Sequence, residues 1–332
     1  MIRSKSLPLV TVVIVNWNGK NVIMPCLEAL RNQTFQAFRT VLVDNGSHDG
    51  SVEYVREHFP EVHVISLSEN HGFSAANNMA LRAVDTKYAA LLNNDAVSDP
   101  DWLATLVHAL EKTPEAGFAA SKILCFHCPD YLDRAGDAYT IAGAGALRGR
   151  GRLSREFGRR EYIFGACAAA AIYRMEMLRE VGFFDESFFL LYEDVDLSFR
   201  AQLMGYRCIF VPESRVLHMV SHSIGRDSYK SVYYGHRNLE WVYIKNMPSR
   251  LILKTFFFHL VYLLLSLLFF TVTGKLRPFV RAKVDALKDM PKILEKRKSI
   301  QKNKRADDAY LWSLLDQERF FLRWFSRKSI RH

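Results

Sequence analysis

The chain of 332 residues has few of the residues that mark fibrous, disordered or disulfide-rich proteins. It contains 17 glycines, 10 prolines and five cysteines, and 49% of its residues are hydrophobic. This composition excludes a collagenous, low-complexity or disulfide-stapled chain, and the length can bury the core of one large or two ordinary domains. The cysteines are odd in number and no secretory apolar segment lies in the first 30 residues, so we expect a reducing compartment.

Two common kinds of phosphate or metal site lack their motifs. We find no glycine-rich phosphate loop that ends in Gly-Lys-Ser or Gly-Lys-Thr. Cys125 and Cys128 have the spacing of half a zinc site, but no second pair of cysteines or histidines completes four ligands. We therefore interpret all five cysteines as ordinary thiols.

The formal net charge of +10 comes almost entirely from one segment. Residues 275–305 carry 12 lysines and arginines against three acidic residues, whereas the remaining residues are nearly balanced. A single basic segment on an otherwise neutral chain argues against nucleic acid as the partner.

An apolar segment precedes the basic one. Residues 255–273 contain no Lys, Arg, Asp, Glu, Pro or Gly, and as a helix they would be about 28 Å long, close to the thickness of a bilayer core. An apolar helix beside a basic cluster is typical of attachment to an anionic membrane surface. A basic cluster beyond a single crossing would violate the positive-inside tendency, so we expect peripheral or monotopic attachment at the cytoplasmic face. A core helix or a homo-oligomer interface is the alternative.

The first 125 residues alternate between apolar strands and amphipathic helices. The expected strands are 9–16, 40–43, 62–67 and 88–92, and the expected helices are 22–31, 50–58 and 74–84, with Ser74 as the N-cap of the last. Strands without polar alternation that are separated by helices predict a parallel sheet covered on both faces. Ligands of such sheets bind beyond the carboxyl ends of the strands, where this chain carries clusters of Asn, Asp and Gly.

Six segments resemble, in order, the motifs of the family 2 glycosyltransferases, in particular their rhamnosyltransferase-like bacterial branch. They are VTVVIVNWNG, VLVDNGSHDGS, ENHGFSAANN, LLNNDA, GFFDESFFLLYEDVDLSFRAQLMGY and VLHMVSHSIG. The resemblance implies an α/β fold of the GT-A type (nucleotide-diphospho-sugar transferase, Rossmann-like) and a nucleotide-sugar donor. It also implies a divalent metal, Mg²⁺ or Mn²⁺, and transfer to an acceptor hydroxyl. The chain departs from the family at His48, where Thr is common, and in having the single Asp95 where some relatives have two or three.

The resemblance assigns the metal and the base. Asp95 resembles the last Asp of the family's metal motif, and His218, expected after a strand at 208–211 and a turn at Pro212, resembles the second ligand, with His222 as the alternative. Asp194 resembles the catalytic base, and Glu193 beside it is a second expected catalytic residue. The dipole at a helix start keeps such carboxylates ionised. We expect Asp196 to pair with Arg200, four residues on.

The resemblance also indicates donor and acceptor residues. For the nucleotide sugar they are Asn16, Trp17, Asp44, Asn45, Asn70, Phe73, Asn77 and Asn94, and on the acceptor side Asp185 and Gly165. Trp17 would stack on the base or, equally, belong to the core. Residues 133–160 are rich in arginine and predict a long mobile loop, which would contact a pyrophosphate or simply be solvated.

These observations predict three regions: a nucleotide-sugar-binding half (1–125), an acceptor and catalytic-base half (126–247) and a membrane-associating helical tail (248–332). We expect an inverting, metal-dependent glycosyltransferase that moves a sugar from a dTDP- or UDP-linked donor to a lipid-linked or growing glycan of the cell envelope. The resemblance suggests rhamnose as the sugar. A nucleotidyltransferase on a similar fold and a non-catalytic nucleotide-sugar-binding scaffold remain as alternatives.

Overall fold

The computed structural model describes residues 8–219 and 228–317 and contains two sheets. Their strands are β1 Val10–Asn16, β2 Phe38–Asp44, β3 His63–Ser66, β4 Tyr88–Leu92, β5 Ala96–Ser98, β6 Ala116–Cys125, β7 Cys128–Arg134, β8 Asp137–Thr140, β9 Gly145–Leu147, β10 Glu161–Ile163, β11 Ala170–Arg174, β12 Arg207–His218 and β13 Leu315–Asp316. The ten-stranded sheet has the order β10-β12-β6-β11-β4-β1-β2-β3, with β5 paired to β12 and β7 to β6. The small sheet has the order β13-β8-β9.

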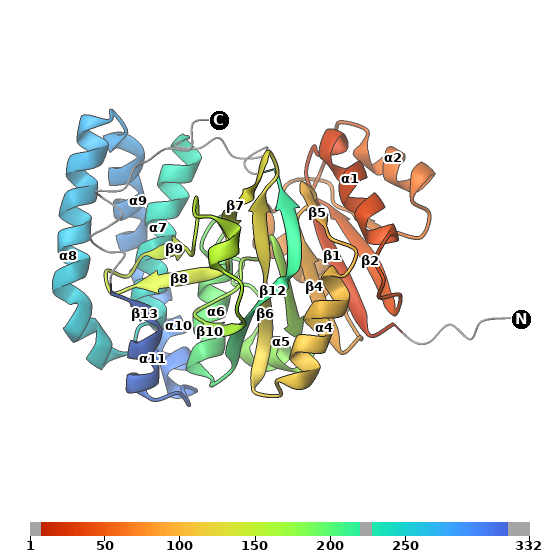
Figure 1. The fold of residues 1–332 in the computed structure, drawn as a ribbon. Coiled ribbons are helices and arrows are strands. Elements are labelled where there is room, and N and C mark those ends of the chain that lie inside the picture. Colours follow the sequence, from red (N-terminus) through yellow and green to blue (C-terminus); the bar gives the residue numbers. More distant parts are fainter. Residues whose placement is uncertain (1–7, 220–227, 318–332) are drawn as a thin grey trace, which may run out of the picture.

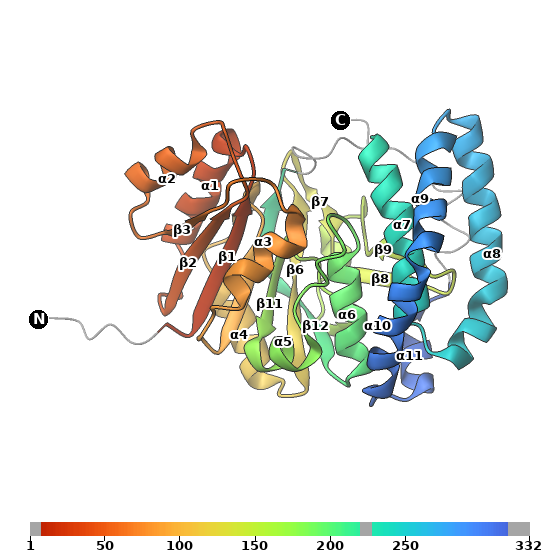
Figure 2. The same cartoon turned by 180° about the vertical axis from the view of Figure 1, so that it is seen from behind.

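Helices cover both faces of the large sheet, and a further group of helices lies at one end of it (Figures 1 and 2). They are α1 Lys20–Arg31, α2 Ser51–His58, α3 Gly72–Leu81, α4 Trp102–Lys112, α5 Met175–Val181, α6 Glu193–Leu203, α7 Tyr229–Asn246, α8 Ser249–Val272, α9 Leu276–Lys288, α10 Met290–Lys302 and α11 Asp308–Leu314, and Ser154–Glu156 form a 3₁₀ turn. Helices α1, α2 and α4 share one core cluster with the sheet, and α3, α5 and α6 share the other. Helices α7 to α11 lie together at the end opposite β3.

The predicted parallel sheet is confirmed in the first half of the chain. Strand β1 pairs in parallel with both β2 and β4, and β2 pairs in parallel with β3. Alternate residues of β1 enter different cores, Val12 and Ile14 on one face and Val13 on the other. The sheet continues past residue 125, because β11 inserts antiparallel between β4 and β6.

The predicted N-cap of α3 is wrong by three residues, because His71 holds that position. The helix begins at Gly72 rather than at Ser74. The side chain of Asn70 accepts a hydrogen bond from the Gly72 N–H at 2.8 Å, so a residue before the helix satisfies one of the free N–H groups of its first turn.

The predicted turn at Pro212 is also wrong. Strand β12 continues from Arg207 to His218, and its register against β6 shifts between Val211 and Arg215. A bulge accommodates a proline within a strand because the ladder hydrogen bond is already interrupted there. His218 is therefore the last residue of a long strand.

Residues 133–160 do not form the expected mobile loop. They contribute β8, β9 and a 3₁₀ turn, and their arginines pair with carboxylates: Arg148 with Glu161, Arg152 with Glu156, Arg160 with Glu213 and Arg150 with Asp133. Three of these four acidic partners lie within or directly after the segment, and Glu213 alone is distant in sequence.

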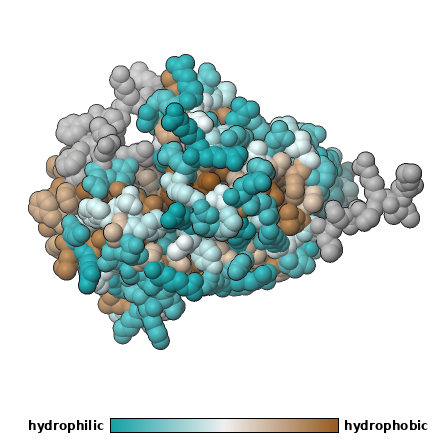
Figure 3. All heavy atoms as spheres, turned by 60° about the horizontal axis from the view of Figure 1, so that its bottom comes forward, coloured by the Kyte–Doolittle hydropathy of each residue, from teal (hydrophilic) through white to brown (hydrophobic). Residues whose placement is uncertain are grey.

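Helix α8 contains the predicted apolar segment. Among the described residues it is long and apolar enough to cross a membrane, with a mean hydropathy of 2.1 over an 18-residue window. Its buried residues form one stripe, Leu251, Thr255, His259, Ser266 and Phe270. Figure 3 shows apolar surface at the edge that α8 occupies in Figure 1. The helix is thus fixed to the rest of the chain along one side and exposed along the other.

Buried ion pairs join the C-terminal helices to α6 and to the loop before it. The ammonium of Lys245 on α7, a residue only 1% exposed, lies 2.6 Å from Asp185 and 2.7 Å from Asp196. Asp196 also receives the predicted Arg200 at 2.9 Å and a hydrogen bond from Asn246 at 2.8 Å. This network fixes α7 against α6.

Replacing Lys245 should test this network. Lys245→Met leaves two buried carboxylates without their shared cation, so we expect a loss of about 3–5 kcal/mol in the free energy of unfolding, measured by urea denaturation. The matched control is Lys87→Met, which breaks the exposed pair with Glu111 and should cost less than about 1 kcal/mol. A loss of the same size in both variants would contradict the assigned role of Lys245.

Candidate active site

Donor residues assemble at the carboxyl ends of β1 and β2. Asn16 ends β1, Asp44 ends β2, and the two are in register. The amide of Asn16 donates to Asp44 at 3.0 Å and to Ser51 at 2.9 Å, and the Ser47 N–H donates to the second oxygen of Asp44 at 2.9 Å. These hydrogen bonds orient the carboxylate of Asp44, which can accept further hydrogen bonds at the edge where parallel sheets bind ligands.

Two more amides extend this cluster in opposite directions. Asn45 donates to Asn70 at 3.0 Å, which ties the loop after β2 to the loop after β3. Asn94 donates to Asn16 at 2.8 Å, which ties in the loop after β4. Trp17 is 38% exposed beside Asn16 and does not belong to the core. The structure thus brings six of the eight predicted donor residues together.

The other two donor residues lie apart from this cluster. Asn77 is 2% exposed and donates to the Phe73 carbonyl of its own helix at 2.9 Å. The ring of Phe73 packs edge-on against Phe184.

Both acceptor-side residues meet other parts of the chain. Asp185 pairs with Lys245 and Lys296, each at 2.6 Å, and although burial raises it, these lysines hold the pKa of Asp185 well below its usual range. A Cβ at Gly165 would lie 2.6 Å from Ser198, so this glycine allows α6 to approach the strand region closely.

The two predicted metal ligands meet because β5 pairs with β12. His218 pairs with Ala96, the residue that follows Asp95 in the chain. The Nε2 atom of His218 is 3.2 Å from the carboxylate of Asp95. Both residues are less than 10% exposed. The other ring nitrogen, Nδ1, is 3.2 Å from Asp133 on β7. His222 lies outside the described residues.

This arrangement fits a divalent cation. Asp95 and His218 each present one ligand atom to the same point. The carboxylate of Asp133, on the other side of the imidazole, orients the ring, as is usual for metal-bound histidines. Burial disfavours the imidazolium, but the hydrogen bonds to Asp133 and Asp95 outweigh it and raise the pKa of His218 to about 9. A cation would take the place of this proton. When bound, it would supply positive charge beside a diphosphate.

Asp194 lies in the first turn of α6, as predicted. One of its oxygens accepts from the Val195 N–H at 2.8 Å and the other from the Ala168 N–H at 3.3 Å. Glu193 is buried, and burial together with the charge of Asp194 raises its pKa well above the usual range. Of the two carboxylates, only Asp194 is held by backbone donors in a partly exposed position.

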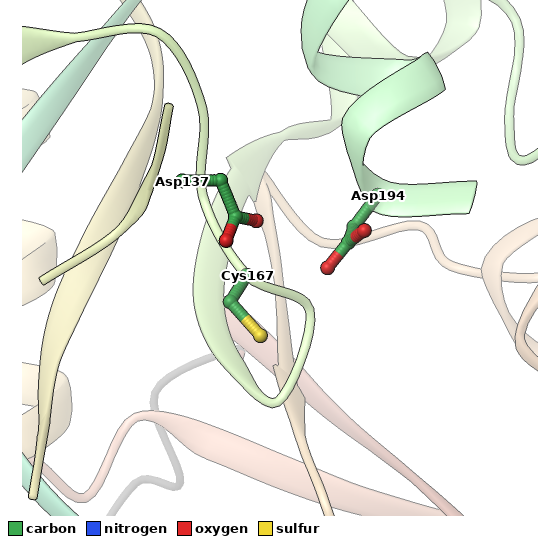
Figure 4. Close-up of side chains that lie close together, drawn as sticks. All are labelled: Asp137, Cys167 and Asp194. Carbon is green, nitrogen blue, oxygen red and sulfur yellow. The ribbon is translucent and has the colours of Figure 1, made fainter. Parts of the chain in front are cut away.

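Asp137 and Cys167 complete the surroundings of Asp194, and sequence reasoning missed both (Figure 4). Their ligand atoms and that of Asp194 all lie within 4.8 Å of one another. Burial and the neighbouring Asp194 raise the pKa of Asp137 to about 8, although Arg134 opposes this. The buried guanidinium of Arg134, 3.3 Å from Asp137, already supplies positive charge here. Two acidic residues around one arginine, Asp133, Arg134 and Asp137, were the available signal for Asp137.

The two predicted metal ligands, Asp95 and His218, and the predicted base Asp194 lie on either side of one short backbone bridge. The Asn93 N–H, at the end of β4, donates to the Ala169 carbonyl at 2.9 Å. The neighbouring Ala168 N–H donates to Asp194. The insertion of β11 beside β4 therefore places a fixed carboxylate next to the loop that carries Asn94 and Asp95.

A mixed sheet in this strand order, covered by helices on both faces, is a fold of the GT-A type. The model of the family "Glycosyl transferase family 2" matches residues 11–182, and the chain belongs to this family. It is a glycosyltransferase. This assignment disfavours the nucleotidyltransferase and the non-catalytic scaffold.

Three known proteins illustrate the similarity. The chain is 28% identical over 239 residues to the O-antigen biosynthesis protein RfbC of Myxococcus xanthus, covering 68% of this chain and 18% of RfbC. It is 25% identical over 260 residues to the N-acetylglucosaminyl-diphospho-decaprenol L-rhamnosyltransferase of Mycobacterium tuberculosis (strain ATCC 25618 / H37Rv), covering 68% and 81%. The structure of GalNAc-T7 with UDP, GalNAc and Mn²⁺ superposes with a TM-score of 0.59 at 17% identity, covering 72% and 48%.

Asp133 offers a test of the metal site that does not depend on turnover. Asp133→Asn weakens the orientation and basicity of His218, so we expect Mn²⁺ affinity, titrated by electron paramagnetic resonance with UDP present, to fall about 10–100-fold. The control is Asp99→Asn, since Asp99 pairs with Arg215 on the surface. An affinity unchanged within threefold in Asp133→Asn would exclude His218 as an oriented ligand.

Proposed function

We propose that this enzyme transfers a sugar from a nucleotide-diphosphate donor to a hydroxyl of a lipid-linked or growing glycan, with inversion, in the synthesis of cell-envelope polysaccharide. The observation that carries the proposal is the backbone bridge from Asn93 to Asp194, which sets a base beside a cation site. The named activities of RfbC and of the mycobacterial rhamnosyltransferase support the envelope glycan and the lipid-linked acceptor.

Each cluster has a proposed role in the transfer. Asn16, Trp17, Asp44, Asn45, Asn70 and Asn94 bind and orient the nucleoside side of the donor, and Phe73 and Asn77 support them from α3. Asp95 and His218 hold Mg²⁺ or Mn²⁺ against the diphosphate. Asp194 takes the proton of the acceptor hydroxyl as its oxygen attacks the anomeric carbon from the face opposite the leaving group, which inverts the configuration.

The buried groups around Asp194 keep it ready as a base. Burial raises the pKa of Glu193, and burial together with Asp194 raises the pKa of Asp137 to about 8, so both shifts reduce the negative charge beside Asp194. Asp185 and Gly165 act on the acceptor side by fixing the loop before α6 and the approach of α6. The three proposed regions keep their sequence bounds: 1–125 for the donor, 126–247 for the acceptor and base, and 248–332 for the membrane.

The donor we propose is a UDP- or dTDP-linked sugar, with rhamnose as the leading candidate. Rhamnose is suggested by the name of the mycobacterial relative. A nucleoside diphosphate leaving group agrees with the UDP and Mn²⁺ in the structure of GalNAc-T7.

We also propose that α8 lies in the plane of the cytoplasmic membrane surface. Its exposed residues Leu253, Phe256, Phe257, Leu260, Leu264, Leu267 and Leu268 recur at helical spacing and form one apolar face. The opposite side is fixed to the protein, with His259 within 3.0 Å of Glu240 and Thr255 within 2.9 Å of Tyr243. A crossing would carry the charged pair of Glu240 and Lys283 into the bilayer, which is costly. Attachment in the plane avoids this cost.

The base assignment predicts a large kinetic effect. In Asp194→Asn, nucleoside diphosphate release from UDP- and dTDP-sugars, with membrane extract as acceptor, should fall about 10²–10⁴-fold. EDTA should abolish release by the wild type, and Mn²⁺ or Mg²⁺ should restore it. Asp130→Asn, at an exposed carboxylate, serves as the matched control. Full activity of Asp194→Asn, or release that does not need metal, would refute the assignment.

The membrane assignment predicts lipid binding without detergent. Wild type should sediment with vesicles that contain phosphatidylglycerol, more weakly at high salt. The double variant Phe257→Glu, Leu264→Glu should bind at least tenfold less because it loses two large apolar contacts. Met79→Glu, at an exposed position on α3, controls for added charge. Vesicle binding unaffected by the double variant would show that α8 is not the contact.

A further inference from the structure

Arg134 ends β7 and lies between the predicted metal ligands and the predicted base. Its Nε atom is 3.5 Å from Oδ2 of Asp133, and the Nδ1 atom of His218 is 3.2 Å from the same oxygen. On the other side, its Nη1 atom donates to Asp137 at 3.3 Å. The ligand atoms of Asp137 and Asp194 lie within 4.8 Å of each other and point into the same space (Figure 4). The guanidinium of Arg134 is therefore adjacent to both groups.

A tight turn places Arg134 and Asp137 side by side. Gly136, between them, has a φ of 80°, and a Cβ at this position would overlap the side chain of Ile163. The turn therefore requires glycine. The backbone N–H of Asp137 then donates to the Gly165 carbonyl at 2.8 Å. The backbone thus fixes the place of the guanidinium before any ligand binds.

The guanidinium of Arg134 forms few hydrogen bonds for a group whose side chain is only 17% exposed. It has five N–H donors. Within residues 8–219 and 228–317 it forms one hydrogen bond, to Asp137, and that bond is longer than the usual 2.7–3.2 Å. The buried Nε has no hydrogen-bond partner among these residues. Most of its donors are therefore available to a ligand that enters the site.

The carboxylates around Arg134 neutralise its charge only in part. Asp133 is shared with His218 and with Arg150, whose guanidinium is 3.2 Å away. Burial raises the pKa of Asp137 to about 8, which reduces the negative charge of this carboxyl group near neutral pH. A guanidinium with spare donors and incomplete compensation suits an anionic ligand, and its planar shape matches two oxygens of a phosphate.

The diphosphate of the donor is the anion that reaches this place in the proposed reaction. Asp95 and His218 lie on its side of the site, and the transferred sugar lies between the diphosphate and Asp194. Arg134 and His218 contact the same oxygen of Asp133, so a phosphate next to His218 is also close to Arg134. The phosphate that carries the sugar is the one nearer the base, where Arg134 lies.

We propose that Arg134 binds the sugar-bearing phosphate of the donor and stabilises the negative charge that this phosphate gains during transfer. This inference rests on the proposed function, because it assumes a nucleotide-diphosphate donor. In the transfer, the bond between the anomeric carbon and the phosphate oxygen breaks, and both of its electrons remain on that oxygen. The acceptor oxygen forms the new bond to the anomeric carbon, and Asp194 takes its proton. A fixed positive charge beside the leaving oxygen lowers the barrier to this step.

Nucleotide binding in the absence of metal tests this contact. Isothermal titration calorimetry on the full chain in EDTA compares UDP with UMP and dTDP with dTMP, which differ by the phosphate in question. Wild type should bind the diphosphate more tightly. Arg134→Gln should lower this preference at least fivefold and keep the monophosphate affinity within twofold, because only the second phosphate loses a partner. The matched control, Arg152→Gln, removes an arginine that pairs with Glu156 on the surface and should keep the preference.

The variant Arg134→Lys separates the contact from a structural role. It keeps a positive charge beside the buried carboxylates but loses the planar fork, so it should retain part of the preference. In the transfer assay its kcat should fall at least tenfold, while the KM for the donor rises less than threefold, because the contact strengthens as the bond breaks. A variant disturbed in its folding would lose affinity for the monophosphate as well.

The outcomes distinguish this contact from the reaction. No preference for the diphosphate in wild type, or an undiminished preference in both Arg134→Gln and Arg134→Lys, overturns the contact and leaves the proposed transfer standing. Where Arg134→Gln also loses monophosphate binding, Arg134→Lys decides, and a preference equal to that of wild type overturns the contact. A preference lost in Arg134→Gln, in an enzyme that transfers no sugar, supports the contact and overturns the proposed function. A wild type that binds none of the four nucleotides overturns both.

Discussion

The buried ion pairs around Lys245 are the constraint on which the rest of the structure depends. A carboxylate as deeply buried as Asp196 is tolerated only with its charge compensated, and the compensating groups come from its own helix, Arg200, and from α7, Lys245. Helix α6 therefore cannot adopt its position without α7. Since α6 carries Asp194 and α7 packs on α8, one electrostatic requirement links the proposed base to the apolar helix α8.

The site itself is made by strand order. The parallel half of the sheet supplies the amides of Asn16 and Asn45 and the hydrogen-bond acceptor Asp44 at one sheet edge. This arrangement needs only local strand–loop–helix units. The Asp95–His218 pair and the position of Asp194 depend on two later pairings, β5 with β12 and β11 with β4. Donor binding and chemistry thus come from different stretches of sequence that share a single sheet.

The features that the sequence predicted are those fixed by neighbouring residues, and the features that it missed depend on contacts between distant parts of the chain. The first four strands were predictable because strands buried on both faces are continuously apolar. The Asp95–His218 pair followed from the resemblance alone, since no spacing rule connects residues more than a hundred positions apart. The ordering of residues 133–160 includes the pairing of β8 with β13, more than 170 residues further along the chain, and β12 continues beyond Pro212 because of its pairing with β6. No local pattern encodes either.

The pairing of β13 with β8 has a consequence for synthesis of the chain. Leu315 and Asp316 lie beside Tyr139 and Thr140, so β8 lacks this neighbour until more than 170 further residues have been made. At roughly 5–20 residues per second, that delay is on the order of 10–35 s. During this interval an apolar strand edge next to the future active site is open to association with other chains. The edge of β8 is therefore closed only after the segment that ends at Asp316 has been made, and deletion of this segment would leave it open.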